Sequence, residues 1–148
     1  MNVVMVGVGA ISGIYLKNIT ETFREIRLVG LCDLIPERAE KGLAFVREQI
    51  AKGIKCEEPV IYPSLDDVLN DPDVDVVLNL TRPYEHYEVT KKSLLKGKHV
   101  YSEKPLAVDM EEAGELYALA REKGLYLGGA PDTFMGAGIQ TCRWLVDS

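Results

Sequence analysis

Residues 2 to 13 read NVVMVGVGAISG, and the order of residue types in this stretch predicts a strand, a tight turn and a helix. Val3 to Val6 form an apolar run of high β-propensity, which is typical of a strand buried on both faces. Gly7 and Gly9 interrupt that run. Apolar residues then recur at helical spacing, namely Ile11, Tyr15, Ile19 and Phe23.

The turn matches a G-x-G-x-x-small pattern and predicts a phosphate-binding site. Gly7 lets the chain turn, and Gly9 lets a phosphate approach the backbone because no Cβ stands in the way. The free N–H groups of the first helical turn, near Ala10 and Ile11, then point at that phosphate. Ser12 supplies the third small residue. Other α/β proteins, methyltransferases included, carry similar turns, but a position between a strand and a helix at the N-terminus favours a dinucleotide site.

A second strand is predicted at residues 26 to 32, and Asp33 follows it directly. This acid lies about 20 residues beyond the turn, the spacing expected of a carboxylate that binds a ribose diol. The alternative is a turn or helix-capping acid ahead of Pro36. Arg38, in the first turn of the next helix, is either a contact for the adenine or a 2′-phosphate, or a solvated helix residue.

The bulk composition describes an ordinary globular domain. The chain has 148 residues, 47% hydrophobic and 27% charged, with a net charge of −6 and a pI of about 5.0. This balance argues against nucleic acid or an anionic membrane surface as the main partner. We find no transmembrane run or signal peptide. The scattered Cys32, Cys56 and Cys142 predict reduced thiols in a cytoplasmic protein, with no zinc site and no other metal expected.

The remaining pattern alternates strands with helices. Further strands are predicted at residues 59–62, 74–80, 98–101 and 125–127, and further helices after Pro36, at 65–70, around 86–94, after Asp109 and at 136–146. Gly128, Gly129 and Pro131 predict a hinge-like turn. The alternation implies right-handed crossovers and an α/β, Rossmann-type doubly wound parallel sheet of about six strands in the order 3-2-1-4-5-6.

Candidate cofactor and catalytic residues follow the ends of the predicted strands, where ligands bind in such sheets. Leu80 and Thr81 end the fourth strand, and Glu103 and Lys104 follow the fifth. A lysine there can hydrogen-bond a hydroxyl or carbonyl and can pass a proton if desolvated. Glu103 can orient that lysine or accept from a ribose. The alternative is an ordinary surface Glu-Lys-Pro turn.

His86 begins a helix beside the same edge. A histidine there can hydrogen-bond a ribose or substrate. Considered without its neighbours, a histidine at a helix start packs on the sheet somewhat more often than it takes part in catalysis. We assign it to the cofactor site and to catalysis together with Lys104. His99 precedes a buried run and is interpreted as structural.

Two further segments make a family resemblance plain. Residues 79–83 (NLTRP) with His86, and residues 97–107 (GKHVYSEKPLA), resemble the signature of the glucose–fructose oxidoreductase, inositol dehydrogenase and rhizopine-catabolism family. The resemblance covers essentially the whole chain, and the glycine turn and Asp33 fit it. It implies an NAD(P)-binding domain with Lys104 near the nicotinamide and the substrate hydroxyl, and with His86 close to the same end. Arg82 departs from the pattern, since many relatives carry proline or a small residue there.

The resemblance also implies a second domain that binds substrate and makes a homo-oligomer. We therefore expect residues 1–148 to be the cofactor domain of a longer enzyme, inactive alone, which transfers hydride between nicotinamide and a sugar, cyclitol or related secondary alcohol. The alternatives are a non-catalytic dinucleotide sensor and a methyltransferase. Asp33 followed by Leu34 favours NAD, with NADP possible if Arg38 turns inward.

Overall fold

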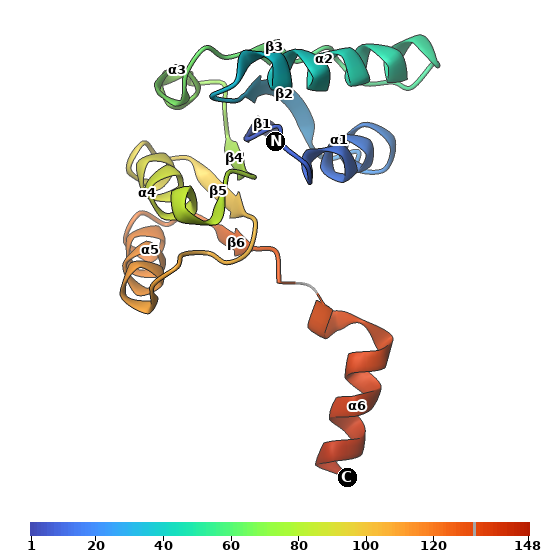
Figure 1. The fold of residues 1–148 in the computed structure, drawn as a ribbon. Coiled ribbons are helices and arrows are strands. Elements are labelled where there is room, and N and C mark those ends of the chain that lie inside the picture. The colour runs from blue at the N-terminus through green and yellow to red at the C-terminus, as the bar shows by residue number, and fades with distance from the viewer. Residues whose placement is uncertain (132) are drawn as a thin grey trace.

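The computed structural model describes residues 1–131 and 133–148. In this part of the chain, six parallel strands form one sheet in the order β3-β2-β1-β4-β5-β6, which confirms the predicted Rossmann topology (Figure 1). The elements are β1 (Asn2–Val6), α1 (Ser12–Glu21), β2 (Arg27–Cys32), α2 (Pro36–Ala51), β3 (Val60–Ile61), α3 (Leu65–Asn70), β4 (Val76–Asn79), η1 (Pro83–Glu85), α4 (His86–Leu95), β5 (His99–Ser102), α5 (Met110–Glu122), β6 (Leu127–Gly129), η2 (Thr133–Met135) and α6 (Ala137–Asp147).

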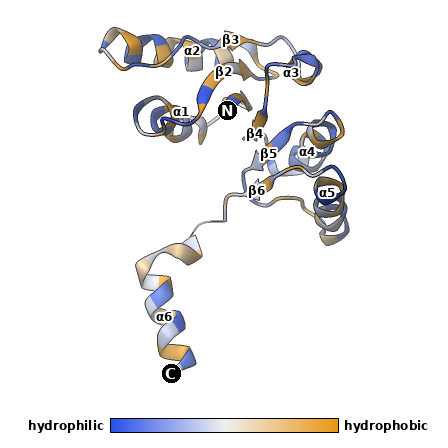
Figure 2. Cartoon of the chain, turned by 180° about the vertical axis from the view of Figure 1, so that it is seen from behind, coloured by the Kyte–Doolittle hydropathy of each residue, from blue (hydrophilic) through white to orange (hydrophobic). Residues whose placement is uncertain are grey.

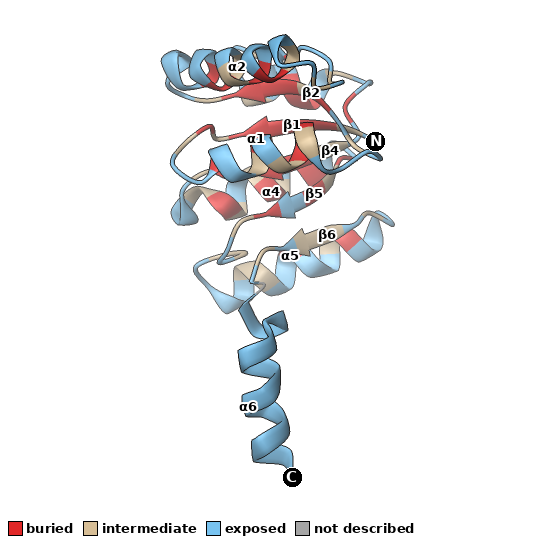
Figure 3. Cartoon of the chain, turned by 90° about the vertical axis from the view of Figure 1, so that its right-hand side faces the viewer, coloured by how far each residue is buried: buried red, intermediate tan, exposed pale blue. Residues whose placement is uncertain are grey.

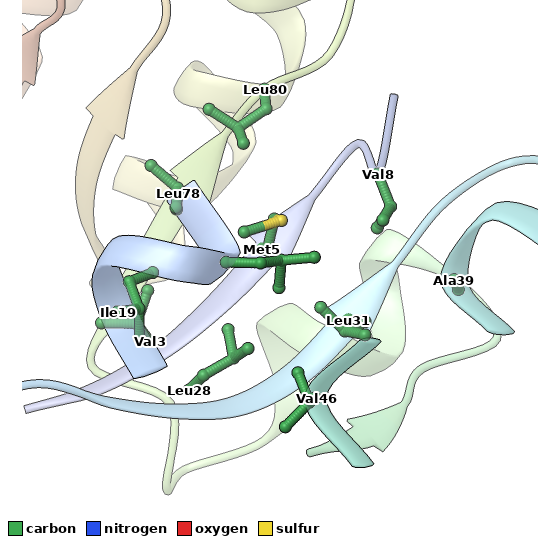
Figure 4. Close-up of a cluster of buried hydrophobic side chains, with 11 residues drawn as sticks. Val3, Met5, Val8, Ile19, Leu28, Leu31, Ala39, Val46, Leu78 and Leu80 are labelled. Atoms are coloured by element: carbon green, nitrogen blue, oxygen red, sulfur yellow. The ribbon is translucent and has the colours of Figure 1, made fainter. Parts of the chain in front are cut away.

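The central strand β1 is buried on both faces because its apolar side chains alternate between two cores. Val3 and Met5 pack with α1 and α2 on one face (Figure 4). Val4 and Val6 pack on the other face with residues of α3 and β4. A third core forms between β5, α4 and α5. Figure 2 shows hydrophobic stretches in β4 and in part of β2.

The helix α1 is shorter than the apolar stripe that was predicted for it from Ile11 to Phe23. Ile11 and Phe23 lie outside α1 and are 45% and 50% exposed, so they are not core residues. The buried face of α1 consists of Ser12, Leu16, Ile19 and Thr20. The stripe prediction was therefore wrong at its two ends, because Ile11 still belongs to the glycine turn as the N-cap and the helix ends at Glu21, before Phe23.

The last strand also differs from its prediction. We expected a strand at residues 125–127 and a hinge at Gly128 and Gly129, but β6 spans Leu127–Gly129. Gly128 pairs with Tyr101 of β5. A Cβ on Gly128 would lie 2.9 Å from Cδ2 of the Tyr101 ring, so glycine is needed here to admit that ring rather than to make a turn.

The helix α6 extends away from the sheet (Figures 1 and 3). None of its residues is buried. Exposed apolar side chains here include Phe134 in η2 and Trp144 in α6. No helix in the described part of the chain is long and apolar enough to cross a bilayer.

Candidate functional site

The strand register brings the predicted site residues to one edge of the sheet. Val6 pairs with Cys32 on one side and with Asn79 on the other, and Asn79 pairs in turn with Ser102. The residues that follow these strand ends therefore start level with one another. Four loops meet at this edge, and they carry Gly7, Asp33, Leu80, Glu103 and their neighbours.

The glycine turn is held close to its neighbouring strands. Gly7 has a φ of +91°, and its N–H donates to the Cys32 carbonyl at 2.8 Å. A Cβ on Gly7 would lie 2.6 Å from the Leu80 carbonyl oxygen. Both observations require glycine, the first for backbone strain and the second for space. Leu80 is itself buried, and its side chain belongs to the core cluster that includes Met5 and Val8.

The next residues of the turn are open to a ligand. A Cβ on Gly9 would meet no other atom within 4 Å. The backbone N–H groups of Ala10 and Ile11 make no hydrogen bond to any residue that the structure describes. Ser12 closes the turn, because its N–H and its hydroxyl both donate to the Gly9 carbonyl, at 3.2 and 2.7 Å. The chain thus offers free N–H donors at a helix N-terminus, the arrangement that suits a phosphate.

Asp33 accepts backbone N–H groups with both carboxylate oxygens, one from the glycine turn and one from its own loop. One accepts the Val8 N–H at 2.6 Å, and the other accepts the Ile35 N–H at 2.8 Å. The side chain is only 5% exposed, and Arg38 Nη1 lies 4.0 Å from it. A carboxylate has lone pairs for roughly four hydrogen bonds, so capacity remains for a ribose hydroxyl. The ribose contact stays a prediction, and the turn-supporting role is additional to it.

A cavity of about 290 Å³ lies beside the glycine turn, between α1 and α2. Its walls are Val8, Gly9, Ala10, Ser12, Gly13, Leu16, Arg38, Lys41, Gly42 and Phe45. Arg38 was predicted to be near the cofactor or solvated, and the structure places it at this cavity with a half-exposed side chain. Lys41 was not singled out from the sequence.

The loop after β4 is organised by a buried amide. Asn79 is fully buried, and its Nδ2 donates at 3.1 Å both to the His86 carbonyl and to Thr90 Oγ1. Its Oδ1 accepts from the Thr81 N–H at 3.3 Å and from Thr81 Oγ1 at 2.6 Å. One side chain therefore fixes both the loop at Thr81 and the start of α4.

His86 joins this loop to the one after β5. It is 1% exposed, with Nδ1 at 2.6 Å from the Pro105 carbonyl oxygen and Nε2 at 2.9 Å from the Thr81 carbonyl oxygen. A neutral imidazole donates to one of these carbonyls, and the imidazolium donates to both. The geometry gives His86 a structural role, while its predicted contact with cofactor or substrate remains a prediction.

Glu103 and Lys104 lie where the sequence placed them. Glu103 accepts from the Tyr15 hydroxyl of α1 at 2.8 Å and from the Lys104 backbone N–H at 2.9 Å. It does not hold the Lys104 ammonium, which is exposed and makes no ion pair or hydrogen bond with the described residues. The Lys104–Pro105 peptide is cis. Tyr15, predicted only as part of an apolar stripe, thus ties α1 to the loop after β5.

Two groups near this edge of the sheet, the Glu85 carboxyl and the Cys32 thiol, have shifted pKa values. The Arg82 guanidinium, 2.6 Å from Glu85, lowers the pKa of that carboxyl through a hydrogen bond. Burial, reinforced by the charges of Asp33 and Asp67, raises the pKa of Cys32 to about 11. The Cys32 thiol is therefore protonated at neutral pH and serves as an apolar residue beneath the site.

Comparison with known proteins identifies the family. Residues 1–129 match the model of an oxidoreductase family with an NAD-binding Rossmann fold, named for glucose–fructose oxidoreductase, inositol dehydrogenase and the rhizopine-catabolism protein. The chain belongs to this family. The match confirms the resemblance and the choice of NAD as cofactor class, and it contradicts the methyltransferase interpretation.

Relatives of the family with known activities cover most of this chain. An inositol 2-dehydrogenase/D-chiro-inositol 3-dehydrogenase of Lactiplantibacillus plantarum is 30% identical over 120 residues, or 81% of this chain and 32% of the relative. A 1,5-anhydro-D-fructose reductase of Ensifer adhaerens is 37% identical over 106 residues, or 70% of this chain and 29% of the relative. The chain thus spans about a third of the length of these relatives.

Solved structures of other dehydrogenases share the fold. The UDP-N-acetylglucosamine 3-dehydrogenase of Acidithiobacillus ferrooxidans has a TM-score of 0.77 at 28% identity, over 98% of this chain and 43% of the other. The scyllo-inositol dehydrogenase of Lactobacillus casei, solved with NAD(H) and scyllo-inositol, has a TM-score of 0.78 at 20% identity, over 99% of this chain and 41% of the other. The second likeness supports the fold alone.

Proposed function

We propose that this chain is the cofactor-binding part of an oxidoreductase that transfers hydride between nicotinamide and a sugar, cyclitol or related secondary alcohol. The observation that carries the proposal is the position of Lys104. Its exposed ammonium, which pairs with no residue in the described part of the chain, stands at the same sheet edge as the glycine turn. The names of the relatives, inositol dehydrogenases and a sugar reductase among them, supply the substrate class.

The residues present fit a dinucleotide. Gly7 allows the tight approach to Leu80 that shapes the turn, and Gly9 leaves open space in front of the free N–H groups of Ala10 and Ile11. These groups would hold the pyrophosphate, and Asp33 would accept from the adenosine ribose. When bound, NAD supplies the hydride acceptor.

The remaining residues would position the substrate oxygen. In the reducing direction the Lys104 ammonium would give a proton to the substrate oxygen as hydride reaches the carbon, and in the oxidising direction the neutral amine would take that proton from the hydroxyl. Glu103 fixes the Lys104 backbone and is itself fixed by Tyr15. His86 joins the Thr81 loop to the Pro105 loop, so that cofactor and substrate contacts keep one relative position. Placement of this kind lowers the entropic cost of reaching the transition state.

The test uses the complete gene product in which this chain occurs. NADH formation is followed with a panel of inositols and aldoses, and NADH binding is measured separately by calorimetry. In Lys104→Ala we expect kcat to fall by about 100-fold or more, because one positioned proton-transfer group contributes roughly that factor, while NADH binding stays unchanged. Lys123→Ala is the control, since Lys123 caps α5 at the far end of the sheet.

The sensor alternative makes a different prediction. A regulatory protein of this fold binds NADH without turning over any member of the panel, and Lys104→Ala then changes neither binding nor turnover. Loss of turnover in Lys104→Ala with binding retained contradicts the sensor. Absence of NADH binding in the complete gene product contradicts both functions.

A further inference from the structure

A second cavity, of about 130 Å³, lies at the amino end of the sheet, away from the glycine turn. Three segments line it: the end of α1 with the link that follows it, the start of β2, and residues 55–57 after α2. Leu28 in its wall pairs with Val3 at the start of β1, whereas the glycine turn follows the end of that strand. Figure 4 shows Ile19 and Leu28 at one end of the core and Val8 at the other.

The cavity lies where the sheet opens between β2 and the segment after α2. The short strand β3 pairs with β2 only through Gly30 and Leu31, near the carboxyl end of β2. Among the described residues, no backbone hydrogen bond joins the start of β2 to residues 55–57. The N–H groups of Lys55 and Glu57 bond no residue of the described part either. The chain therefore leaves space and free donors beside the first residues of β2.

The inner side of the cavity is apolar. Ile19 and Leu28 are buried and belong to the core cluster between the sheet and α1 and α2. Cys56 packs against that cluster, and burial raises the pKa of its thiol, so the thiol is uncharged at neutral pH. The half-exposed ring of Phe23 also lines the cavity. A ligand here therefore meets hydrocarbon on its inner side.

Positive charge dominates the exposed side of the cavity. Arg24, Arg27 and Lys55 line it together with a single acid, Glu57. Glu57 already pairs with Arg27. Glu25 follows Arg24 in the chain but does not line the cavity. The side chains of Arg24 and Lys55 make no ion pair or hydrogen bond within the described ranges 1–131 and 133–148. Two free cations, on a chain whose net charge is −6, favour an anion at this place.

The two sides of the cavity together suit a carboxylate better than an inorganic anion. A phosphate needs donors around all of its oxygens, and the inner wall supplies none, because the Thr20 hydroxyl already donates to the Leu16 carbonyl at 2.9 Å. A carboxylate needs donors at one end only. Arg24 and Lys55 can supply them as charge-assisted hydrogen bonds, which are stronger than neutral ones. The remainder of such a ligand would lie against Leu28 and its apolar neighbours.

We propose that this cavity is a second ligand site, for a short aliphatic carboxylate. The aliphatic chain has to be short, because 130 Å³ has room for only about four water molecules. The site lies at the opposite end of α1 from the dinucleotide site proposed above and does not depend on it.

The experiment measures butyrate binding to the complete gene product by saturation-transfer NMR, which detects weak binding through the ligand's own methyl signal. We expect a Kd on the order of 1 mM, because so small a ligand makes few contacts. Butyramide has nearly the same shape without the charge and should bind about tenfold more weakly. Acetate is shorter by two CH₂ groups and should also bind about tenfold more weakly, since each buried CH₂ contributes roughly three- to fourfold.

Variants test the charged and the apolar side separately. Lys55→Gln and Arg24→Gln should each weaken butyrate binding about three- to tenfold and leave butyramide unchanged. Cys56→Leu keeps the charge and fills the inner side, so it should remove the advantage of butyrate over acetate. Lys17→Gln is the matched control, because it removes an exposed lysine of α1 that does not line the cavity, and it should change no affinity. Circular dichroism checks that each variant is folded.

Four results would overturn the carboxylate site. They are equal binding of butyrate and butyramide, equal binding of butyrate and acetate, an equal effect of Lys55→Gln and Lys17→Gln, and tighter binding of inorganic phosphate in competition with butyrate. Competition between butyrate and NADH would also overturn it, because the two sites lie at opposite ends of α1 and should fill independently. Loss of NADH binding with butyrate binding retained would contradict the proposed function alone.

Discussion

The two halves of the sheet contribute different kinds of group to the same edge, backbone groups in one half and side chains in the other. The first half, β1 to β3, supplies backbone: a glycine with positive φ, an open glycine and N–H groups that bond no described residue, in a turn that Asp33 holds at Val8. The second half, β4 to β6, supplies side chains: Asn79, His86 and Glu103 hold its loops through hydrogen bonds. The first half should therefore be damaged by added atoms, and the second by removed ones.

The largest effect is expected at Gly7. A Cβ there meets the Leu80 carbonyl oxygen at 2.6 Å, and its φ of +91° is strained for alanine. We expect Gly7→Ala to lower the free energy of unfolding by about 2–5 kcal/mol, as the sum of backbone strain and overpacking. Urea unfolding followed by circular dichroism measures this loss.

Gly53→Ala is the matched control for Gly7→Ala. Gly53 has a φ of +89° but no atom within 4 Å of its Cβ position. Its substitution should cost about 1–2 kcal/mol, the strain alone. Equal losses of unfolding free energy in the two variants would show that the contact of Gly7 with the segment after β4 does not matter. That result would contradict the contrast between the two halves of the sheet.

The second half is tested at Asn79. Asn79→Ala removes two donated hydrogen bonds and leaves Thr81 and Thr90 without their partner. We expect a loss of about 2–3 kcal/mol in unfolding free energy, because the groups left behind are buried or partly buried. Asn70→Ala, at an exposed amide on α3, should change stability by only about 0.5 kcal/mol. A loss in Asn79→Ala no larger than in this control would contradict the network's role.

A smaller effect is expected at Asp33, where the first half also uses a side chain. Asp33→Ala should weaken NADH binding more than NADPH binding, because the 2′-hydroxyl loses its acceptor while a 2′-phosphate loses a repulsion. Calorimetric titration of both nucleotides measures the difference. Equal losses would remove Asp33 from the ribose contact and leave it only the support of Val8 and Ile35.

The sequence predicted the backbone half better than the side-chain half. The apolar run of β1, the glycines and the alternation of elements led directly to the strand order, because local pattern determines burial and turn geometry. Gly128 was misplaced in a hinge, since its need for glycine comes from Tyr101 on another strand. No local pattern contains such a contact.

The site residues show the same limit. Position at a strand end was enough to predict that Asp33, Thr81 and Lys104 lie at the same edge of the sheet. It did not reveal the use of Asn79, which reads as the last residue of an apolar run, nor the bond from Tyr15 to Glu103, 88 residues apart. The available signal for the role of Asn79 was an asparagine at the end of a strand predicted to be buried. No local pattern signalled the hydrogen bond from Tyr15 to Glu103.

The exposure of α6 has a consequence for optical studies of the protein. The chain has a single tryptophan, and Trp144 is 66% exposed on a helix with no buried residue. Its emission should be that of a water-exposed indole. The emission should change little when the sheet unfolds or when a nucleotide binds at the carboxyl ends of the strands. The same isolation makes Trp144 a selective fluorophore for anything that comes to cover α6, where a blue shift would mark the contact.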